Sequence, residues 1–244
     1  MVFMPKFNHL LTAGFVLAMA FTFSCNLGVG GGCQPSWLCP SGSEYKGGSC
    51  NAADYEPVNI GGQIWMAKNW GCYAPGSGCY EHKDANCEKY GRLYDWATAM
   101  DIDAKYNSEE WGGSNVKHRG ICPPQWHIPS LEEWNALLAF ARENPSHGLE
   151  YKRLISSDWK GASGTDDFGF SALPGGYARI DGERSWFLQI GSAGQVGSAG
   201  VWHVAGGEQS AEFTEVFYLF SYGSTIDFHG FKEYLFSIRC VKDE

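Results

Sequence analysis

Nine cysteines constrain this chain more strongly than any other feature of its sequence. They stand at Cys25, Cys33, Cys39, Cys50, Cys72, Cys79, Cys87, Cys122 and Cys240. No Cys-x-x-Cys spacing occurs and no paired-histidine motif accompanies the thiols, so a zinc site is disfavoured. Such a set persists as disulfides in an oxidising compartment. Setting Cys25 aside leaves an even number that can pair completely, although the residues alone leave the pairing open.

The N-terminus indicates why Cys25 is set apart. Residues 10–23 form a largely apolar run behind Lys6, too short for the roughly 20 residues that span a bilayer. Its length suits a secretory signal, and Ser24 followed by Cys25 resembles a lipoprotein cleavage site. We expect a signal peptide over residues 1–24, with Cys25 acylated as a membrane anchor in the bacterial cell envelope, at the outer membrane surface. Ordinary cleavage after a small residue and an uncleaved buried helix are the alternatives.

Composition describes the rest of the chain as a globular domain. Of its 244 residues, 44% are hydrophobic and 15% aromatic, enough for a substantial core. Eighteen basic residues against 27 acidic ones give a net charge of −9, which argues against a nucleic-acid partner. Residues 25–56 lack periodicity and are predicted to be a tether and a cysteine-rich appendage. The domain is expected over residues 57–244.

Local patterns predict the elements of this domain. Residues 58–65 alternate loosely around Gly61 and Gly62, as in a hairpin. Helical spacing of apolar residues predicts one helix over 90–100 and another over 130–140, where Ser130 and Glu133 can form a capping box. Short apolar runs then predict the strands of an antiparallel sheet with long loops. These runs are residues 168–173, 177–180, 186–190, 201–204, 213–220 and 234–241.

Five ordered motifs carry a resemblance to a known family. They are VNIGGQIWMAKNW, NCEKYGRLYDWATAM, CPPQWHIPSLEEW, GTDDFGFSALPGGY and FSIRCVKD. Together they resemble the Fibrobacter succinogenes major paralogous domain, whose members are typically secreted or lipid-anchored bacterial surface proteins. By analogy with the superfold of C-type lectins and formylglycine-generating enzymes, the resemblance implies an α+β fold. In that C-type-lectin-like fold, two helices pack on a small antiparallel or mixed sheet with long loops, stapled by disulfides, and the first and last strands pair.

The resemblance also implies disulfide partners. Cys79 and Cys87 bracket a loop where the family commonly has a cysteine pair. Cys122 matches a family position expected to meet Cys240 in the last strand. Cys33 with Cys39, and Cys50 with Cys72, are then the local choices for the remaining four.

No catalytic motif is present, so we expect no enzymatic activity, no cofactor and no metal site. Asp166 and Asp167 are the strongest candidates for functional carboxylates. Adjacent residues seldom lie on either side of a glycosidic bond, however, so the favoured interpretation is that they form turns before the apolar run at residues 168–173. His127 is interpreted as a structural imidazole rather than a base, while His203 is ambiguous. A formylglycine-generating enzyme needs reactive thiols and a metal, whereas each cysteine here has a disulfide or lipid role.

Aromatic residues are the best functional feature, because flat rings stack on sugar rings. Trp65, Trp96, Trp126 and Trp134 are predicted to be core. The candidate ligand-binding rings are Trp186, Trp202, Tyr177, Tyr218 and Tyr222. We therefore expect a surface domain that binds polysaccharide or another extracellular ligand. The alternatives are an adhesive domain that contacts surface proteins through a broad apolar patch, and an enzyme with perturbed pKa values in a pocket.

Overall fold

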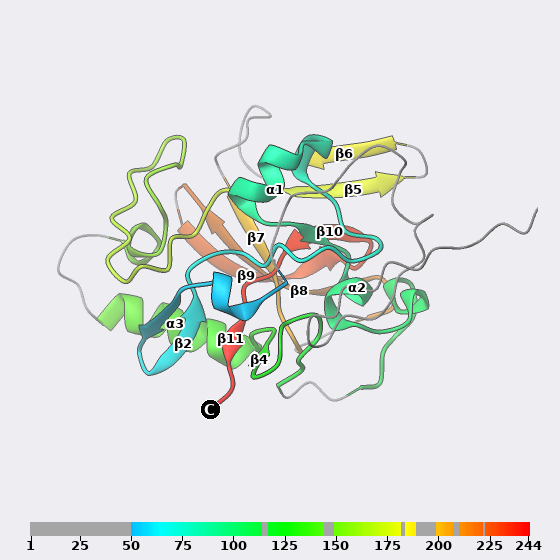
Figure 1. Cartoon of the computed structure of the whole chain (residues 1–244), viewed down its shortest axis with the longest axis horizontal. Coiled ribbons are helices and arrows are strands. Elements are labelled where there is room, and N and C mark those ends of the chain that lie inside the picture. The colour runs from blue at the N-terminus through cyan, green and yellow to red at the C-terminus, as the bar shows by residue number, and fades with distance from the viewer. Residues whose placement is uncertain are drawn as a thin grey trace, which may run out of the picture. The chain divides into compact units, whose positions relative to one another are not determined.

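The computed structural model describes residues 50–113, 117–143, 149–181, 184–188, 199–206, 210–221 and 223–244. All of them lie within one compact unit, Lys46–Glu244. Two sheets, three α-helices and four short 3-10 helices make up its regular structure in the described ranges (Figure 1). The predicted α+β class is therefore confirmed. None of the helices in these ranges has the length and apolar character needed to cross a membrane.

The first sheet has four strands in the order β1-β2-β11-β4, all antiparallel. Its strands are β1 (Pro57–Ile60), β2 (Gln63–Met66), β11 (Val241–Lys242) and β4 (Trp126–His127). Gly61 and Gly62 have φ values of 61° and 89° and form the turn of the predicted hairpin. Trp65 in β2 lies opposite Val241 in β11, so the last strand pairs with the second strand of the domain rather than with the first strand, which the resemblance implied.

The second sheet has seven strands in the order β6-β5-β10-β7-β8-β9, with β3 also paired to β10. Its strands are β3 (Leu93–Tyr94), β5 (Tyr177–Asp181), β6 (Arg184–Leu188), β7 (Ala199–His203), β8 (Phe213–Phe220), β9 (Gly223–Phe231) and β10 (Tyr234–Ser237). The pairing of β10 with β7 is parallel and the others are antiparallel, so the sheet is mixed. The predicted run 213–220 coincides with β8, whereas β9 was not among the predicted strands.

The helices differ from prediction in one region. They are α1 (Asp84–Tyr90), α2 (Trp96–Met100) and α3 (Leu131–Glu143). The single helix expected over residues 90–100 is wrong, because Gly91, with φ 80°, ends α1 and the next residues form β3 against β10. The Asp95 side chain then accepts a hydrogen bond from the Thr98 backbone and starts α2. Pairing of Leu93 and Tyr94 with β10 therefore decides the local structure, although the spacing of apolar residues favours a helix.

The predicted start of α3 is confirmed. Ser130 Oγ accepts a hydrogen bond from the backbone N–H of Glu133 (3.2 Å), and the Glu133 carboxylate accepts one from the backbone N–H of Ser130 (2.8 Å). Figure 1 shows α3 beside the hairpin strand β2. The ring centroid of its Trp134 lies 4.9 Å from that of Trp65 in β2 and 4.2 Å from that of Phe217 in β8. The helix thereby joins the two sheets through one buried aromatic cluster.

The run at 168–173 was predicted as a strand and is not one. Asp166, Gly169 and Ser171 all have positive φ values, which interrupt extended backbone. Only an isolated bridge between Ile155 and Ala172 remains. The segment nevertheless buries Phe170 completely, so its apolar character reflects core packing rather than a strand.

Three disulfides are present among the described residues. They join Cys50 to Cys72, Cys79 to Cys87 and Cys122 to Cys240. All three pairs agree with the expected pairing. Cys25, Cys33 and Cys39 lie outside the described residues.

Candidate functional site

Two of the five rings expected to bind ligand are buried, which corrects the prediction. Trp202 is 0% exposed, because its strand β7 lies between β10 and β8 and all five of its residues are buried. Its indole N–H donates to Asn69 Oδ1 (2.9 Å). Tyr218 is 8% exposed and stacks on Phe220 at 5.5 Å. Neither ring presents a face to a ligand.

Of the other three candidates, only Tyr177 has a described side chain, and it packs against the buried cluster that contains Tyr218. Tyr177 is half-buried at the start of β5, with its ring 6.0 Å from that of Tyr234. Trp186 lies in β6 opposite Arg179, but its side chain is outside the described part. Tyr222 lies outside the described residues altogether. The burial of Trp202 and Tyr218 therefore excludes a platform that uses all five rings.

A polar pocket lies elsewhere, between α1 and the chain that follows β2. It has a volume of about 150 Å³ and is lined by residues from three segments, 54–55, 68–71 and 87–91. Sequence reasoning missed it, although Lys68, Asn69, Glu88 and Lys89 all stand in the quoted motifs. The only available signal was the presence of polar residues among otherwise apolar motif positions.

Asn69 lies at the buried side of this pocket. It is 4% exposed, and its Nδ2 donates to the Tyr90 carbonyl (2.8 Å) and to Ser237 Oγ (3.4 Å). Its Oδ1 accepts from both Trp202 Nε1 and Arg239 Nε, each at 2.9 Å. Because these bonds use its donors and acceptor within the core, Asn69 holds the pocket wall in place and is not itself a ligand-binding group.

The rim of the pocket carries charges of both signs. Asp54, Glu88, Lys68 and Lys89 are all exposed lining residues. Lys89 also pairs with Asp158 at 3.3 Å across the surface. The formal charges of the four lining side chains cancel, so the pocket offers both donors and acceptors without a strong net field.

The pocket walls are held together by close backbone approach. The Arg92 backbone N–H donates to the Trp70 carbonyl (3.1 Å), which places the segments around residues 70 and 92 side by side. A Cβ on Gly91 would come within 2.6 Å of the Asn69 Cβ and 2.9 Å of the Trp70 carbonyl oxygen. Only glycine fits there. The disulfides Cys50–Cys72 and Cys79–Cys87 tie down the outer segments.

The other predicted polar candidates have structural partners. Asp166 accepts hydrogen bonds from the backbone N–H and the hydroxyl of Ser171, whereas Asp167 pairs with Arg153 at 2.6 Å. The two carboxylates thus serve different structural contacts. His203 is fully buried with Nε2 2.7 Å from the Tyr94 carbonyl, and burial lowers its pKa to about 4. Within the described ranges, no group of three metal-ligating side chains is close enough to hold a metal ion.

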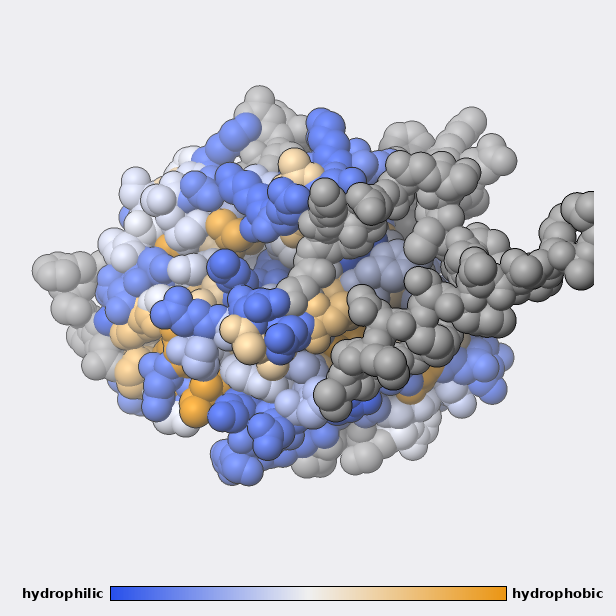
Figure 2. Space-filling view, viewed as in Figure 1, coloured by the Kyte–Doolittle hydropathy of each residue, from blue (hydrophilic) through white to orange (hydrophobic). Residues whose placement is uncertain are grey.

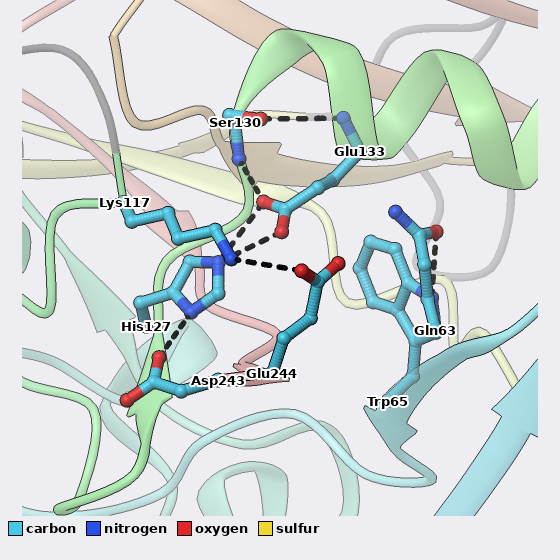
Figure 3. Close-up of polar contacts among 8 residues, drawn as sticks. All are labelled: Gln63, Trp65, Lys117, His127, Ser130, Glu133, Asp243 and Glu244. Atoms are coloured by element: carbon cyan, nitrogen blue, oxygen red, sulfur yellow. Dashed lines mark hydrogen bonds and ion pairs between the residues drawn. The ribbon is translucent and has the colours of Figure 1, made fainter.

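His127 connects three parts of the fold (Figure 3). Its side chain is 1% exposed, with Nδ1 2.6 Å from Asp243 Oδ1 and Nε2 2.9 Å from Glu133 Oε1. Burial alone lowers its pKa, but the hydrogen bonds and charges of the two carboxylates outweigh burial and raise the pKa above 6.5. For Glu133, burial by itself raises the pKa. The hydrogen bonds that its carboxylate accepts from His127 and Ser130 outweigh burial and lower the pKa below 4.5. Both ring nitrogens are engaged, which supports the structural interpretation.

This cluster predicts a pH-dependent contribution to stability. A raised folded pKa means that the contribution of His127 is complete below its unfolded pKa, near 6.5, and is lost as the pH rises through the folded value. The contribution of Glu133 is lost as the pH falls through its own lowered value. Glu133→Gln keeps the capping box but removes the charge. We expect urea unfolding to show a larger loss of stability for this variant near pH 5.5 than near pH 8.5.

The neighbouring variant Glu132→Gln is the matched control, since Glu132 is exposed on the same turn of α3. It should show no such pH dependence. An equal cost of Glu133→Gln at both pH values would contradict an ionised pair with His127.

Comparison with known proteins identifies the matched part of the chain. The Fibrobacter succinogenes major domain matches residues 58–242. No curated protein and no solved structure matches the chain. Two of the three pocket segments lie inside the matched region, whereas Asp54 and Tyr55 precede it. One wall of the pocket is therefore supplied from outside the family domain.

Proposed function

We propose that this chain, which belongs to the Fibrobacter succinogenes major domain family, is a lipid-anchored bacterial surface domain that binds saccharide in the polar pocket. The pocket is the single observation that carries the proposal. At about 150 Å³ it is smaller than the roughly 300–1,000 Å³ of sites that enclose drug-sized ligands. It therefore suits one sugar unit of a longer polysaccharide.

The chemistry of the rim favours a neutral polyhydroxylated ligand. Each sugar hydroxyl both donates and accepts, so a suitable site needs both kinds of group within reach. Asp54 and Glu88 supply acceptors, while Lys68 and Lys89 supply donors. A phosphorylated ligand would call for an excess of cations, and the four rim charges cancel instead. Recognition here would rest on hydrogen bonds rather than on the aromatic platform first expected.

An anchored, lectin-like architecture is part of the proposal. The pairing of β2 with β11, the packing of α3 on both sheets and the Cys122–Cys240 staple support a C-type-lectin-like fold. The signal-like N-terminus supports acylation at Cys25, and with it the membrane as a partner at the outer membrane surface. Metabolic acyl labelling that persists in Cys25→Ser would contradict the anchor.

The adhesive alternative receives less support from the surface. A protein-binding face of this kind would present a broad apolar patch. Among the described residues, the exposed large hydrophobic side chains are only Tyr73 and Leu149. Figure 2 shows apolar residues on the viewed face as small separate areas among hydrophilic ones. The saccharide proposal is therefore preferred.

Binding of the purified chain, with its disulfides intact, to soluble glucans, mannans, xylans and peptidoglycan fragments tests the proposal. We expect saturable binding to at least one of them, unaffected by a chelator. Glu88→Gln should weaken it about fivefold, because the amide still accepts a hydrogen bond but a bond to a charged group is worth about 1 kcal/mol more than a neutral one.

Glu143→Gln serves as the control, since Glu143 is an exposed carboxylate at the end of α3 and does not line the pocket. Its affinity should equal that of the unmodified chain. Absence of binding across the panel would refute the proposal. So would binding that neither Glu88→Gln nor Asp54→Asn weakens.

A further inference from the structure

Tyr73 combines exposure with firm support, which sets it apart from the other rings whose side chains the structure describes. Its side chain is 41% exposed. The guanidinium carbon of Arg92 lies 5.0 Å from its ring centroid, in the range of a cation–π contact. Arg92 itself is only 4% exposed. A solvent-accessible ring thus lies on a buried, charged support.

The support is itself held in place. Arg92 Nε donates to Ser77 Oγ (2.9 Å) and Nη2 donates to the Ser77 carbonyl (3.3 Å). Ser77 in turn closes a tight turn, because its backbone N–H donates to the Ala74 carbonyl at 3.0 Å. The guanidinium beneath Tyr73 therefore has a defined position.

The backbone on the other side of Tyr73 is also fixed. Cys72 is bonded to Cys50, and its carbonyl accepts a hydrogen bond from the Tyr94 hydroxyl (2.6 Å). A ring mounted on such a backbone loses little conformational freedom when a ligand stacks on it. Tyr73 is preorganised for contact with a flat apolar surface.

Tyr73 is also close to the polar pocket along the chain. Gly71 lines the pocket and precedes Tyr73 by two residues, which span at most about 7 Å between Cα atoms. Gly91, in the neighbouring pocket segment, directly precedes Arg92. The ring and its support therefore follow two pocket-lining segments that run side by side.

We propose that Tyr73 forms a second subsite, where the sugar unit next to the one in the pocket stacks on the ring. The ligand is then an oligosaccharide segment of at least two units rather than a single monosaccharide. The apolar C–H face of a pyranose matches an aromatic ring, while its hydroxyls remain in water or reach the pocket rim. This inference rests on the saccharide-binding function proposed above.

A length series tests the inference. The probes are fragments of one, two, three and four sugar units prepared from glucan, mannan and xylan, with affinities measured by calorimetry on the oxidised full chain. For the fragments that bind, Tyr73→Ala should weaken those of two or more units about fivefold or more and leave the single unit unchanged. Tyr73→Trp should retain or increase affinity for the longer fragments. If Tyr73 acted only through its hydroxyl or its size within the fold, the larger ring without a hydroxyl would not preserve binding.

Leu149→Ala is the matched control, because Leu149 is the other exposed large hydrophobic side chain in the described part. It should bind every fragment as the unmodified chain does. If Glu88→Gln weakens binding but Tyr73→Ala leaves affinity unchanged at every length, the second subsite is wrong and the pocket function stands. If no fragment and no polysaccharide binds, both the function and the subsite are refuted. Unchanged thermal midpoints and near-UV spectra exclude misfolding of the variants as the cause.

Discussion

Replacing Asn69 by leucine is expected to lower the free energy of unfolding by at least about 3 kcal/mol, because it leaves several buried polar groups without partners. Leucine resembles asparagine in size but can neither donate nor accept. Trp202 and Arg239 would each lose the acceptor that now lies 2.9 Å away, and the Tyr90 carbonyl would lose its donor at 2.8 Å. An unsatisfied buried group costs about 1–3 kcal/mol, and a charged one costs more.

Arg239 makes this change especially costly. Its side chain is fully buried, and burial lowers its pKa to about 9, offset in part by the charge of Asp166. Its Nη1 donates to the Met66 and Phe170 carbonyls, but Nη2 has no hydrogen-bond partner among the described residues. Asn69 is one of the three described hydrogen-bond acceptors that hold this buried cation, so its loss is costly.

Urea unfolding of the oxidised chain measures the effect. Lys68→Ala is the control, since Lys68 is the exposed neighbour of Asn69 and its removal should change stability by no more than about 0.5 kcal/mol. A loss below about 1 kcal/mol for Asn69→Leu would show that the freed groups find other partners.

Removing the Cys122–Cys240 bridge is expected to cost still more. The two residues are 118 positions apart, and loop-closure entropy for such a length amounts to about 4–5 kcal/mol. The bridge joins the loop before β4 to the residue before β11, and β11 links β2 with β4 in the four-stranded sheet. The double substitution Cys122→Ala and Cys240→Ala should therefore destabilise the sheet as well as the α3 entry.

The matched comparison is removal of Cys79–Cys87 by the same substitutions. Those residues are 8 positions apart, so the same entropy argument gives only about 2–3 kcal/mol. We expect the long bridge to cost the larger amount in denaturant unfolding. An equal loss, or the reverse order, would show that chain entropy is not what makes the long bridge stabilising.

Local features of the fold were predictable because their determinants lie within a few residues of one another. The hairpin needs Gly61 and Gly62, whose positive φ values suit its turn. The start of α3 needs Ser130 and Glu133, which exchange hydrogen bonds three residues apart. The disulfide pairs were expected from the family resemblance rather than from the residues themselves.

Other predictions depended on partners far away in the chain. The helix expected over residues 90–100 is interrupted because Leu93 and Tyr94 pair with β10, more than a hundred residues later. Trp202 was a reasonable candidate for an exposed ring, but its strand lies between two others in the seven-stranded sheet. Strand neighbours in a mixed sheet cannot be read from local periodicity.

The sequence by itself determined the hairpin and the capped helix, because short-range hydrogen bonds and turn geometry decide these elements. The family and the α+β class followed from the resemblance that the five ordered motifs carry. Only the tertiary structure decided the polar pocket and its buried wall. Asn69 meets partners 21, 133, 168 and 170 residues away, and those contacts exist only once both sheets are assembled. A side chain whose role depends on such distant partners has no local signature, since each contact is created by folding itself.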